Sequence, residues 1–166
     1  MANYLKNNWW KILIKLVLMG LILTFDMLTK MHFSKTTSTI PFIKGFISFR
    51  YIQNTGAAFG IFGNQQTMLI AISIIFICFF TYWEITNKDK NVWSALAYVC
   101  VIAGALGNLV DRLFLGYVRD FINFDFVTWG IFNIADTFIT IGCVLYVIYF
   151  VIELVKQKRK KSDIQS

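Results

Sequence analysis

Four long apolar stretches dominate the pattern of hydrophobic and polar positions along the chain. They cover residues 12–31, 67–85, 93–113 and 132–155, and each approaches the roughly 20 apolar residues that a helix needs to cross a bilayer. We therefore expect a mainly α-helical membrane protein with four transmembrane helices, folded as a single integral membrane domain over residues 1–166. The 57% content of hydrophobic residues and the mean hydropathy of +0.62 exceed what a soluble core requires.

Basic residues gather at one end of these predicted helices. Ten of the sixteen lysines and arginines lie in the two termini or in the short 87–91 loop, and six lie elsewhere. Because four spans put both termini on one side, the positive-inside rule places that side, with the tail over 156–166, in the cytoplasm. Segments 33–66 and 114–131 are then extracytoplasmic. The net charge of +7 predicts contact with anionic membrane lipid and not with nucleic acid.

The two outer segments are too rich in aromatic and β-forming residues for ordinary loops. Residues 46–53 and 121–127 show partial alternation of apolar and polar positions, which is typical of short strands. We expect a small β-sheet at the membrane surface, where amphipathic aromatic side chains collect. A plain aromatic belt is the alternative. The aromatic residues concerned are Phe42, Phe46, Phe59, Phe62, Phe124, Phe126 and Trp129.

Charged side chains mark the outer ends of the predicted helices. Such groups cost about 2.5 to 3.5 kcal/mol each at membrane depth, so their clustering calls for an explanation. Asp26 lies four residues before Lys30, and Asp111 adjoins Arg112. We interpret both sets as ion pairs or hydrogen-bonded supports at helix ends.

A polar seam is predicted between the third and fourth helices. On each of them polar residues recur at spacings of three and four, so they share one face, and glycines on the third helix allow a close approach. Asp136 is the fifth residue of its expected span and remains within reach of water. The residues of the seam are Gly104, Gly107, Asn108 and Asp111 on one helix and Asn133, Asp136, Thr137 and Thr140 on the other.

Asp120 and Asp136 are the candidate reactive groups. Asp120 follows the third predicted helix, and the short link over 121–131 lets it return toward Asp136. Two carboxylates in one site do not both ionise readily, so one acts as an acid and the other as a base. Such a pair can hydrolyse a peptide bond with water alone. Spacing by itself leaves two interpretations open, a carboxylate dyad or two independent capping or pairing residues.

No signal for a cofactor appears in the sequence. The three cysteines, Cys78, Cys100 and Cys143, lie in apolar runs without CxxC spacing or a neighbouring histidine. We therefore expect neither a metal ion nor another cofactor.

Five short motifs, in order along the chain, resemble those of the bacterial lipoprotein signal peptidases, also called signal peptidase II. Residues 26–30 are similar to that family's D-x-x-[ST]-K motif, 54–59 to N-x-G-A-[AS]-[FW], and 104–112 to G-x-x-G-N-x-x-D-R. Residues 118–121 and 132–136 resemble the segments that carry its catalytic aspartates. The departures are mild: Ala103 stands where the family often has glycine, and Met27 replaces a common polar residue.

The resemblance implies an aspartic endopeptidase of the bacterial cytoplasmic membrane. It would cleave diacylglyceryl-modified prolipoproteins just before the lipidated cysteine, and it would have four transmembrane helices with a small extracytoplasmic β-sheet. We expect, separately, that the chain acts as a monomer. Asp120 and Asp136 become the catalytic dyad, with Asp26 and Lys30 as structural support. The residues that would shape the site are Asn54, Gly56, Asn108, Asp111, Arg112, Asn133 and Ala135.

A small proton- or cation-coupled transporter is the alternative function, because intramembrane carboxylates also line ion pathways. Against it, the acidic residues cluster toward one side of the membrane. The helix over 67–85 offers no charge at mid-depth, since Glu84 lies at its cytoplasmic end. A scaffold without activity explains neither the polar seam nor the position of Asp120.

Overall fold

The structure is a computed structural model that describes residues 2–56, 62–87 and 91–165. Three residues of the second motif, Ala57, Ala58 and Phe59, lie outside these ranges, as do Lys88 and Lys90 of the expected cytoplasmic loop.

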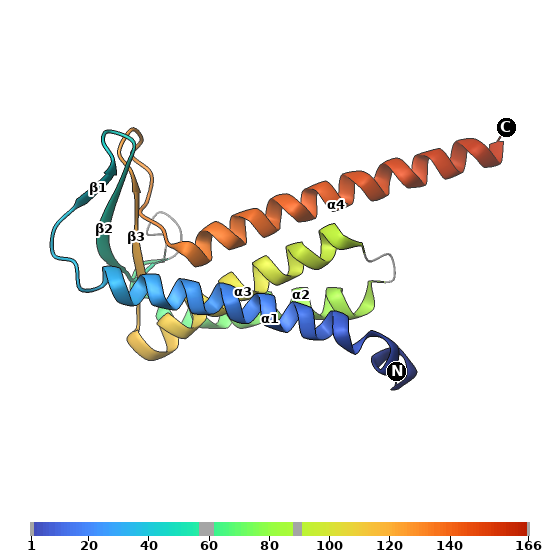
Figure 1. The fold of residues 1–166 in the computed structure, drawn as a ribbon, viewed down its shortest axis with the longest axis horizontal. Coiled ribbons are helices and arrows are strands. Elements are labelled where there is room, and N and C mark those ends of the chain that lie inside the picture. Colours follow the sequence, from blue (N-terminus) through green and yellow to red (C-terminus); the bar gives the residue numbers. More distant parts are fainter. Residues whose placement is uncertain (1, 57–61, 88–90, 166) are drawn as a thin grey trace.

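Within the described ranges the chain forms four long helices, which confirms the predicted class (Figure 1). They are α1 (Ala2–Phe33), α2 (Gln66–Thr86), α3 (Val92–Leu115) and α4 (Ile134–Gln165). Each contains a segment long and apolar enough to cross a membrane. The helices extend beyond the expected spans because polar helix-forming residues, such as those of the basic tail, continue them past the apolar stretches.

The centre of the bundle is α3, which contacts each of the other three helices. Its start is fixed by a capping box between Asn91 and Ser94, and Gly116 ends it with a positive φ of 77°. Small residues bring α4 close: a Cβ added to Gly142 would lie 2.9 Å from the carbonyl oxygen of Ala97. Gly104 and Gly107 of α3 likewise face Ala135, so the α3–α4 seam predicted from the sequence is present and the start of α4 lies beside the C-terminal half of α3.

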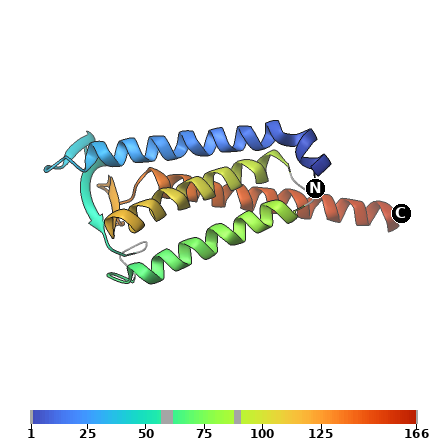
Figure 2. The ribbon, with the colours of Figure 1, turned by 90° about the horizontal axis from the view of Figure 1, so that it is seen from below.

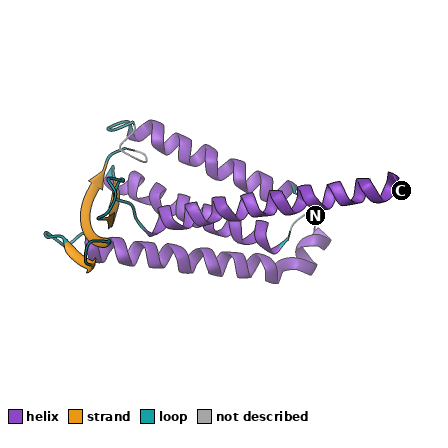
Figure 3. Cartoon of the chain, turned by 90° about the horizontal axis from the view of Figure 1, so that it is seen from above, coloured by secondary structure: helices purple, strands orange, loops and turns teal. Residues whose placement is uncertain are grey.

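A three-stranded antiparallel sheet, in the order β1-β2-β3, lies at one end of the bundle. Its strands are β1 (Ile40–Ile43), β2 (Ile47–Asn54) and β3 (Val118–Phe124). Figures 1 and 2 show both termini at the end of the helices that is far from the sheet. Figure 3 shows the sheet lying across the other end of the bundle. The small sheet that we expected is therefore present.

The strand bounds correct the prediction in one place. The expected strand over 121–127 begins earlier and ends earlier, as β3. It pairs Val118 with Asn54 of β2, and it ends because Asp125 enters a turn, where its carboxylate accepts hydrogen bonds from Ser48 (2.6 Å) and Asn123 (2.8 Å). The strand β1 was not predicted.

The start of α4 is a second correction. Residue 132 was expected to be helical, but Phe132 pairs with Ile122 of β3 as an extended bridge, and Asn133 caps the helix. Asp136 is consequently the third residue of α4 and lies in its first turn, not five residues into the span. This places its carboxyl group next to the end of the sheet.

Aromatic rings join the sheet to the helices. Phe33, the last residue of α1, lies 4.5 Å from the rings of both Phe49 and Phe121. Phe46 and Phe126, both predicted to be part of an aromatic cluster, stack at 4.6 Å. The sheet is thus held against the end of α1 by apolar contacts, which fixes β3 relative to the helices.

Candidate active site

Strand alternation sends successive side chains of β3 to opposite faces of the sheet. Asp120 faces a cavity together with Val118 and Phe124. Arg119 and Phe121, the residues between them, contact Asp111 of α3 and Phe33 of α1 instead. The position of Asp120 is thus set by the register of β3 against β2.

Asp120 is 99% buried, since only 1% of its surface is exposed, and both of its carboxylate oxygens accept hydrogen bonds. Asn54 donates to Oδ2 at 2.8 Å and Asn133 donates to Oδ1 at 2.6 Å. Burial raises the pKa of Asp120 to about 7, and the carboxylate of Asp136 adds to the rise, while the two amides oppose it. Asp120 can therefore hold or release a proton near neutral pH.

Asp136 is held by the end of its own helix and by α3. Its Oδ1 accepts a hydrogen bond from Asn108 Nδ2 at 2.7 Å, and its Oδ2 accepts one from the backbone N–H of Asn133 at 3.1 Å. Asn133 Oδ1 in turn accepts from the backbone N–H of Asp136 at 2.9 Å. This reciprocal pair is a capping box, so one carboxylate both starts α4 and faces the cavity.

The side chain of Asn133 connects the two carboxylates. Its amide nitrogen donates to Asp120 and also to Asn108 Oδ1 at 3.0 Å, while its backbone N–H donates to Asp136. Because Asn133 is fully buried, these donors are withheld from water. A single residue therefore orients both aspartates.

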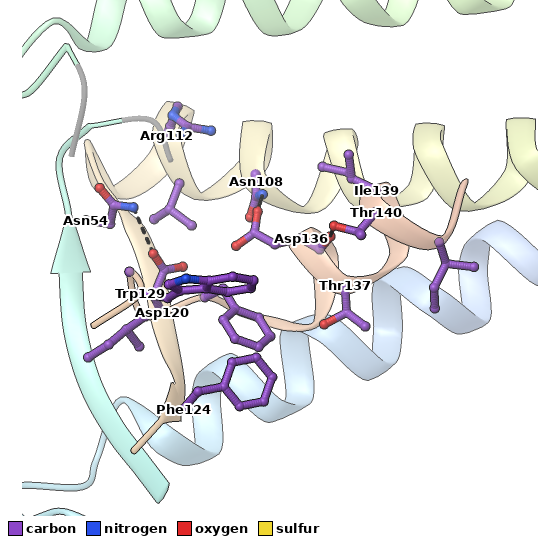
Figure 4. A pocket seen from close by; sticks show the side chains of 15 residues that line it. Asn54, Asn108, Arg112, Asp120, Phe124, Trp129, Asp136, Thr137, Ile139 and Thr140 are labelled. Carbon is purple, nitrogen blue, oxygen red and sulfur yellow. Dashed lines mark hydrogen bonds between the residues drawn. The ribbon is translucent and has the colours of Figure 1, made fainter. Parts of the chain in front are cut away.

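Both aspartates line one cavity of about 550 Å³, seen from close by in Figure 4. Asp120 and Asp136 point toward the same space from β3 and α4, and Trp129, whose ring packs near that of Phe124, also lines the cavity. Away from the carboxylates the cavity continues along α4, where most of its lining is apolar. The further lining residues are Asn54, Asn108, Arg112, Val118, Phe124, Gly130, Ile131, Phe132, Thr137, Ile139, Thr140 and Ile141.

Behind Asp136 lies a buried cation, Lys30, with no exposed surface. Its Nζ is 2.8 Å from Asp26 Oδ2 and 3.4 Å from Asp111 Oδ2, and it donates to Asn108 Oδ1 at 3.0 Å. Asp26 Oδ1 also accepts the backbone N–H of Ala135 at 2.8 Å. The α1 residues interpreted as structural support thus join α1 to both α3 and α4, and they reach Asp136 through Asn108.

Asp111 does not form an ion pair with the adjacent Arg112, and it serves instead as a hydrogen-bonded support at the end of α3, the other interpretation given for it. Asp111 binds Arg119, whose Nη2 is 2.7 Å from Oδ1 and whose backbone N–H donates to Oδ2 at 3.0 Å. Adjacent residues of a helix project in different directions, so Arg112 points away from Asp111. Arg112 lines the cavity and donates to the carbonyl oxygen of Gly56 at 3.1 Å.

Gly56 links Arg112 to the site through Asn54. The backbone N–H of Gly56 donates to Asn54 Oδ1 at 2.9 Å, which turns the amide nitrogen of Asn54 toward Asp120. All the site residues predicted from the sequence therefore fall in one connected cluster. Sequence reasoning missed Arg119, and it named Trp129 only as part of the outer aromatic set and not as a residue of the cavity. The alternation along β3 would have shown that Arg119 and Asp120 face opposite ways.

Four membrane-spanning helices, a sheet across their end and a buried carboxylate pair in a cavity define an integral membrane protein with a candidate acid–base site. The chain belongs to the signal peptidase II family, because the family described as signal peptidase (SPase) II matches residues 18–152. As a member it is a peptidase.

Individual relatives agree with this assignment. Lipoprotein signal peptidases from two serotypes of Streptococcus pyogenes are each 44% identical over 108 residues, which cover 65% of this chain and 71% of theirs. A bacterial membrane enzyme solved by the in meso method at 2.3 Å resolution has a TM-score of 0.80 and 31% identity, covering 85% of this chain and 89% of its own. A second such structure, at 1.9 Å resolution, has a TM-score of 0.76 and 32% identity, covering 82% and 92%.

Proposed function

We propose that the chain is an aspartic endopeptidase that removes the signal peptide from diacylglyceryl-modified prolipoproteins, cleaving just before the lipidated cysteine. The observation that carries the proposal is the placement of Asp120 and Asp136 on one cavity, joined by Asn133. Relatives named lipoprotein signal peptidases support the choice of substrate.

The reaction uses one proton shared by the two carboxylates. The ionised member removes a proton from a water molecule, which attacks the carbonyl carbon of the scissile bond, while the protonated member donates to the carbonyl oxygen. The C–N bond of the resulting tetrahedral intermediate then breaks as the carboxyl group that took the proton from water gives it to the leaving nitrogen, and the proton on the former carbonyl oxygen returns to the other carboxylate. Because carboxylates supply both proton transfers, this route needs no metal ion or other cofactor.

The surrounding charges favour a single shared proton. Three cations lie in the cluster, Lys30, Arg112 and Arg119, against four carboxylates. With one proton on the dyad the positive and negative charges are equal in number. Buried charge is costly unless it is balanced, so the singly protonated dyad is the favoured resting form.

The cavity suits a substrate that is confined to the bilayer. Its apolar part follows α4 from Asp136 toward Ile141, about 7 Å along the helix axis at ~1.5 Å per residue. Acyl chains and the apolar part of a signal peptide can occupy this side while the scissile bond meets the carboxylates. Binding energy from the lipid is then available remote from the chemistry.

The proposal includes an orientation in the bacterial cytoplasmic membrane. Both termini lie at the end of the bundle away from the sheet, and the basic tail over 156–166 extends from it. With that end in the cytoplasm, the sheet and the two aspartates lie toward the outer leaflet, where lipidated precursors are presented. The enzyme would act as a monomer, since both aspartates come from one chain.

The transporter alternative loses its support. Membership in a peptidase family favours a peptidase site over an ion pathway. The buried charge of α2, Glu84, forms an ion pair with Lys15 at the end of the bundle away from Asp120 and Asp136.

A cleavage assay tests the proposal. The purified protein, mixed with a diacylglyceryl-modified prolipoprotein, should produce the gel shift that accompanies loss of the signal peptide, and EDTA should leave the rate unchanged. Asp120→Asn and Asp136→Asn should each abolish the shift. Asp125→Asn is the matched control, because Asp125 is exposed at the tip of the sheet. This variant should cleave the substrate normally. Inhibition by EDTA, or normal cleavage by either dyad variant, would refute the mechanism.

A further inference from the structure

The two aspartates of the proposed dyad have unequal partners. Asp120 accepts hydrogen bonds from two neutral side-chain amides, at 2.8 and 2.6 Å. Asp136 accepts one from the backbone N–H that precedes α4 and one from Asn108, whose amide oxygen faces the ammonium group of Lys30. The environment of Asp136 therefore favours a negative charge more strongly.

From this asymmetry we propose that Asp136 is the base that activates water, that Asp120 carries the shared proton as the acid, and that Lys30 fixes these roles by acting through Asn108. Lys30 is a positioning residue in this assignment, since it contacts neither the cavity nor the reacting atoms. The inference rests on the proposed function and goes beyond it by giving each carboxylate its own role.

Two hydrogen bonds connect Lys30 to Asp136 through Asn108, and both are donated in the direction of Asp136. Lys30 Nζ donates to Asn108 Oδ1 at 3.0 Å, and Asn108 Nδ2 donates to Asp136 Oδ1 at 2.7 Å. A flipped amide would set its NH₂ group against the ammonium, so the cation dictates which way Asn108 points. A donor polarised by a neighbouring cation forms a stronger hydrogen bond to a carboxylate. Because Lys30 is fully buried, water does not screen its charge.

The start of α4 acts in the same direction. Asp136 lies in the first turn, where free N–H groups and the helix dipole stabilise negative charge. Asp120 lies in a strand, and strands have only a small net dipole.

The remaining charges near the dyad do not reverse this difference. Arg112 lines the same cavity as both aspartates and donates to the carbonyl oxygen of Gly56, and Arg119 is occupied by Asp111 at 2.7 Å. Lys30 attracts Asp120 as well, so its selectivity comes from the hydrogen bonds through Asn108. The pKa of Asp120, raised to about 7 by burial and then by the charge of Asp136, is consistent with a protonated Asp120 below neutral pH. The charged groups around the pair are Lys30 and Asp26 on α1, Asp111 and Arg112 on α3, and Arg119 on β3.

A matched pair of variants tests which aspartate is the base. The readout is the pH profile of kcat/KM with a synthetic diacylglyceryl lipopeptide that spans the cleavage site. Asn108→Ala removes a donor from Asp136 alone, so the acid limb of the profile, where the base becomes protonated, should move up by about one pH unit. Asn54→Ala removes a donor from Asp120 alone, so it should move the alkaline limb upward and leave the acid limb in place. The opposite result would exchange the two roles and overturn the assignment.

A second pair tests the charge of Lys30. Lys30→Met should move the acid limb to higher pH, because the base loses a nearby cation. Asp26→Asn keeps the shape and an acceptor for Ala135 but removes a negative charge, so it should move the acid limb to lower pH. A residue with only a structural role would lower the rate and leave both limbs where they are. If Lys30→Met does not fold, Asp26→Asn alone tests the inference. An acid limb that stays in place or moves to higher pH in Asp26→Asn would refute the role of Lys30.

The wild type separates this inference from the proposed function. If the wild type cleaves the lipopeptide and both dyad variants do not, the proposed function stands, however the acid and alkaline limbs of the pH profile shift in the other variants. If the wild type does not cleave it, the proposed function fails and so does the inference built on it.

Discussion

Asn133 and Asp136 exchange two hydrogen bonds across the first turn of α4, at 2.9 and 3.1 Å. The residues that start this helix therefore also place one carboxylate of the proposed dyad, and the same asparagine holds the other. The same two residues therefore both cap the helix and arrange the site.

Two substitutions of Asn133 should separate these tasks. Asn133→Ser keeps an oxygen that can cap α4 but loses the buried amide nitrogen that reaches Asp120 and Asn108, so kcat should fall by about 100-fold or more and stability should fall by the loss of those hydrogen bonds alone. Asn133→Ala should lose the same activity and in addition about 1 kcal/mol of stability. Thermal unfolding in detergent and the cleavage rate check both. Equal melting temperatures for the two variants would contradict the capping role.

The pH dependence follows from Asp120. Burial and the charge of Asp136 raise its pKa to about 7, so its carboxyl group is protonated below that pH and ionised above it. Since the reaction needs one proton on the dyad, kcat/KM should fall as the pH rises through about 7. Initial rates between pH 4 and 9 in one buffer system of constant ionic strength measure this. A rate that keeps rising across that range would show that the shared proton is not required.

Gly107 should not tolerate a side chain. A Cβ there would lie 2.6 Å from Asp26 Oδ2 and 3.3 Å from the Cβ of Ala135, so Gly107→Ala would push Asp26 away from Lys30. We expect a loss of about 1 to 3 kcal/mol of stability. Gly20→Ala is the matched control, because nothing lies within 4 Å of its added Cβ and alanine is the better helix former. The prediction fails if both variants melt at the same temperature.

Arg119 should contribute more to stability than an exposed cation does. Its partner Asp111 is buried, and breaking a buried pair typically costs about 3 kcal/mol or more, so Arg119→Met should lower the melting temperature clearly. Lys156→Met breaks an exposed pair with Glu153 and should cost less than about 0.5 kcal/mol. Chemical or thermal unfolding of the two variants in the same detergent compares them. Equal losses would contradict the view that Asp111 depends on Arg119.

The fold could be predicted from the sequence where apolar length decides it. The four spans follow from the cost of exposing polar backbone to lipid, and the α3–α4 seam follows from the spacing of Gly104, Gly107 and Asn108. Strand β1 was missed because its residues, Ile40-Pro41-Phe42-Ile43, show no alternation and contain a proline.

The details of the site depend on tertiary contacts. The start of α4 was misplaced because Phe132, apolar enough for a helix, is held in an extended bridge by Ile122. Arg119 was not identified as the partner of Asp111 because it reaches Asp111 only after the chain turns at Gly116 and re-enters as β3. The link that Asn133 makes between the two aspartates depends likewise on the packing of β3 against the start of α4, which residue spacing does not encode.

The central claim is that Asp120 and Asp136 together cleave the substrate. Its most direct test is the mass of the products that the purified, lipid-reconstituted protein releases from a diacylglyceryl-modified prolipoprotein. The wild type and Asp125→Asn should release a signal peptide that ends at the residue before the lipidated cysteine, and Asp120→Asn and Asp136→Asn should release none while remaining folded. Cleavage by either dyad variant at the wild-type rate, or cleavage at another bond, would contradict the account.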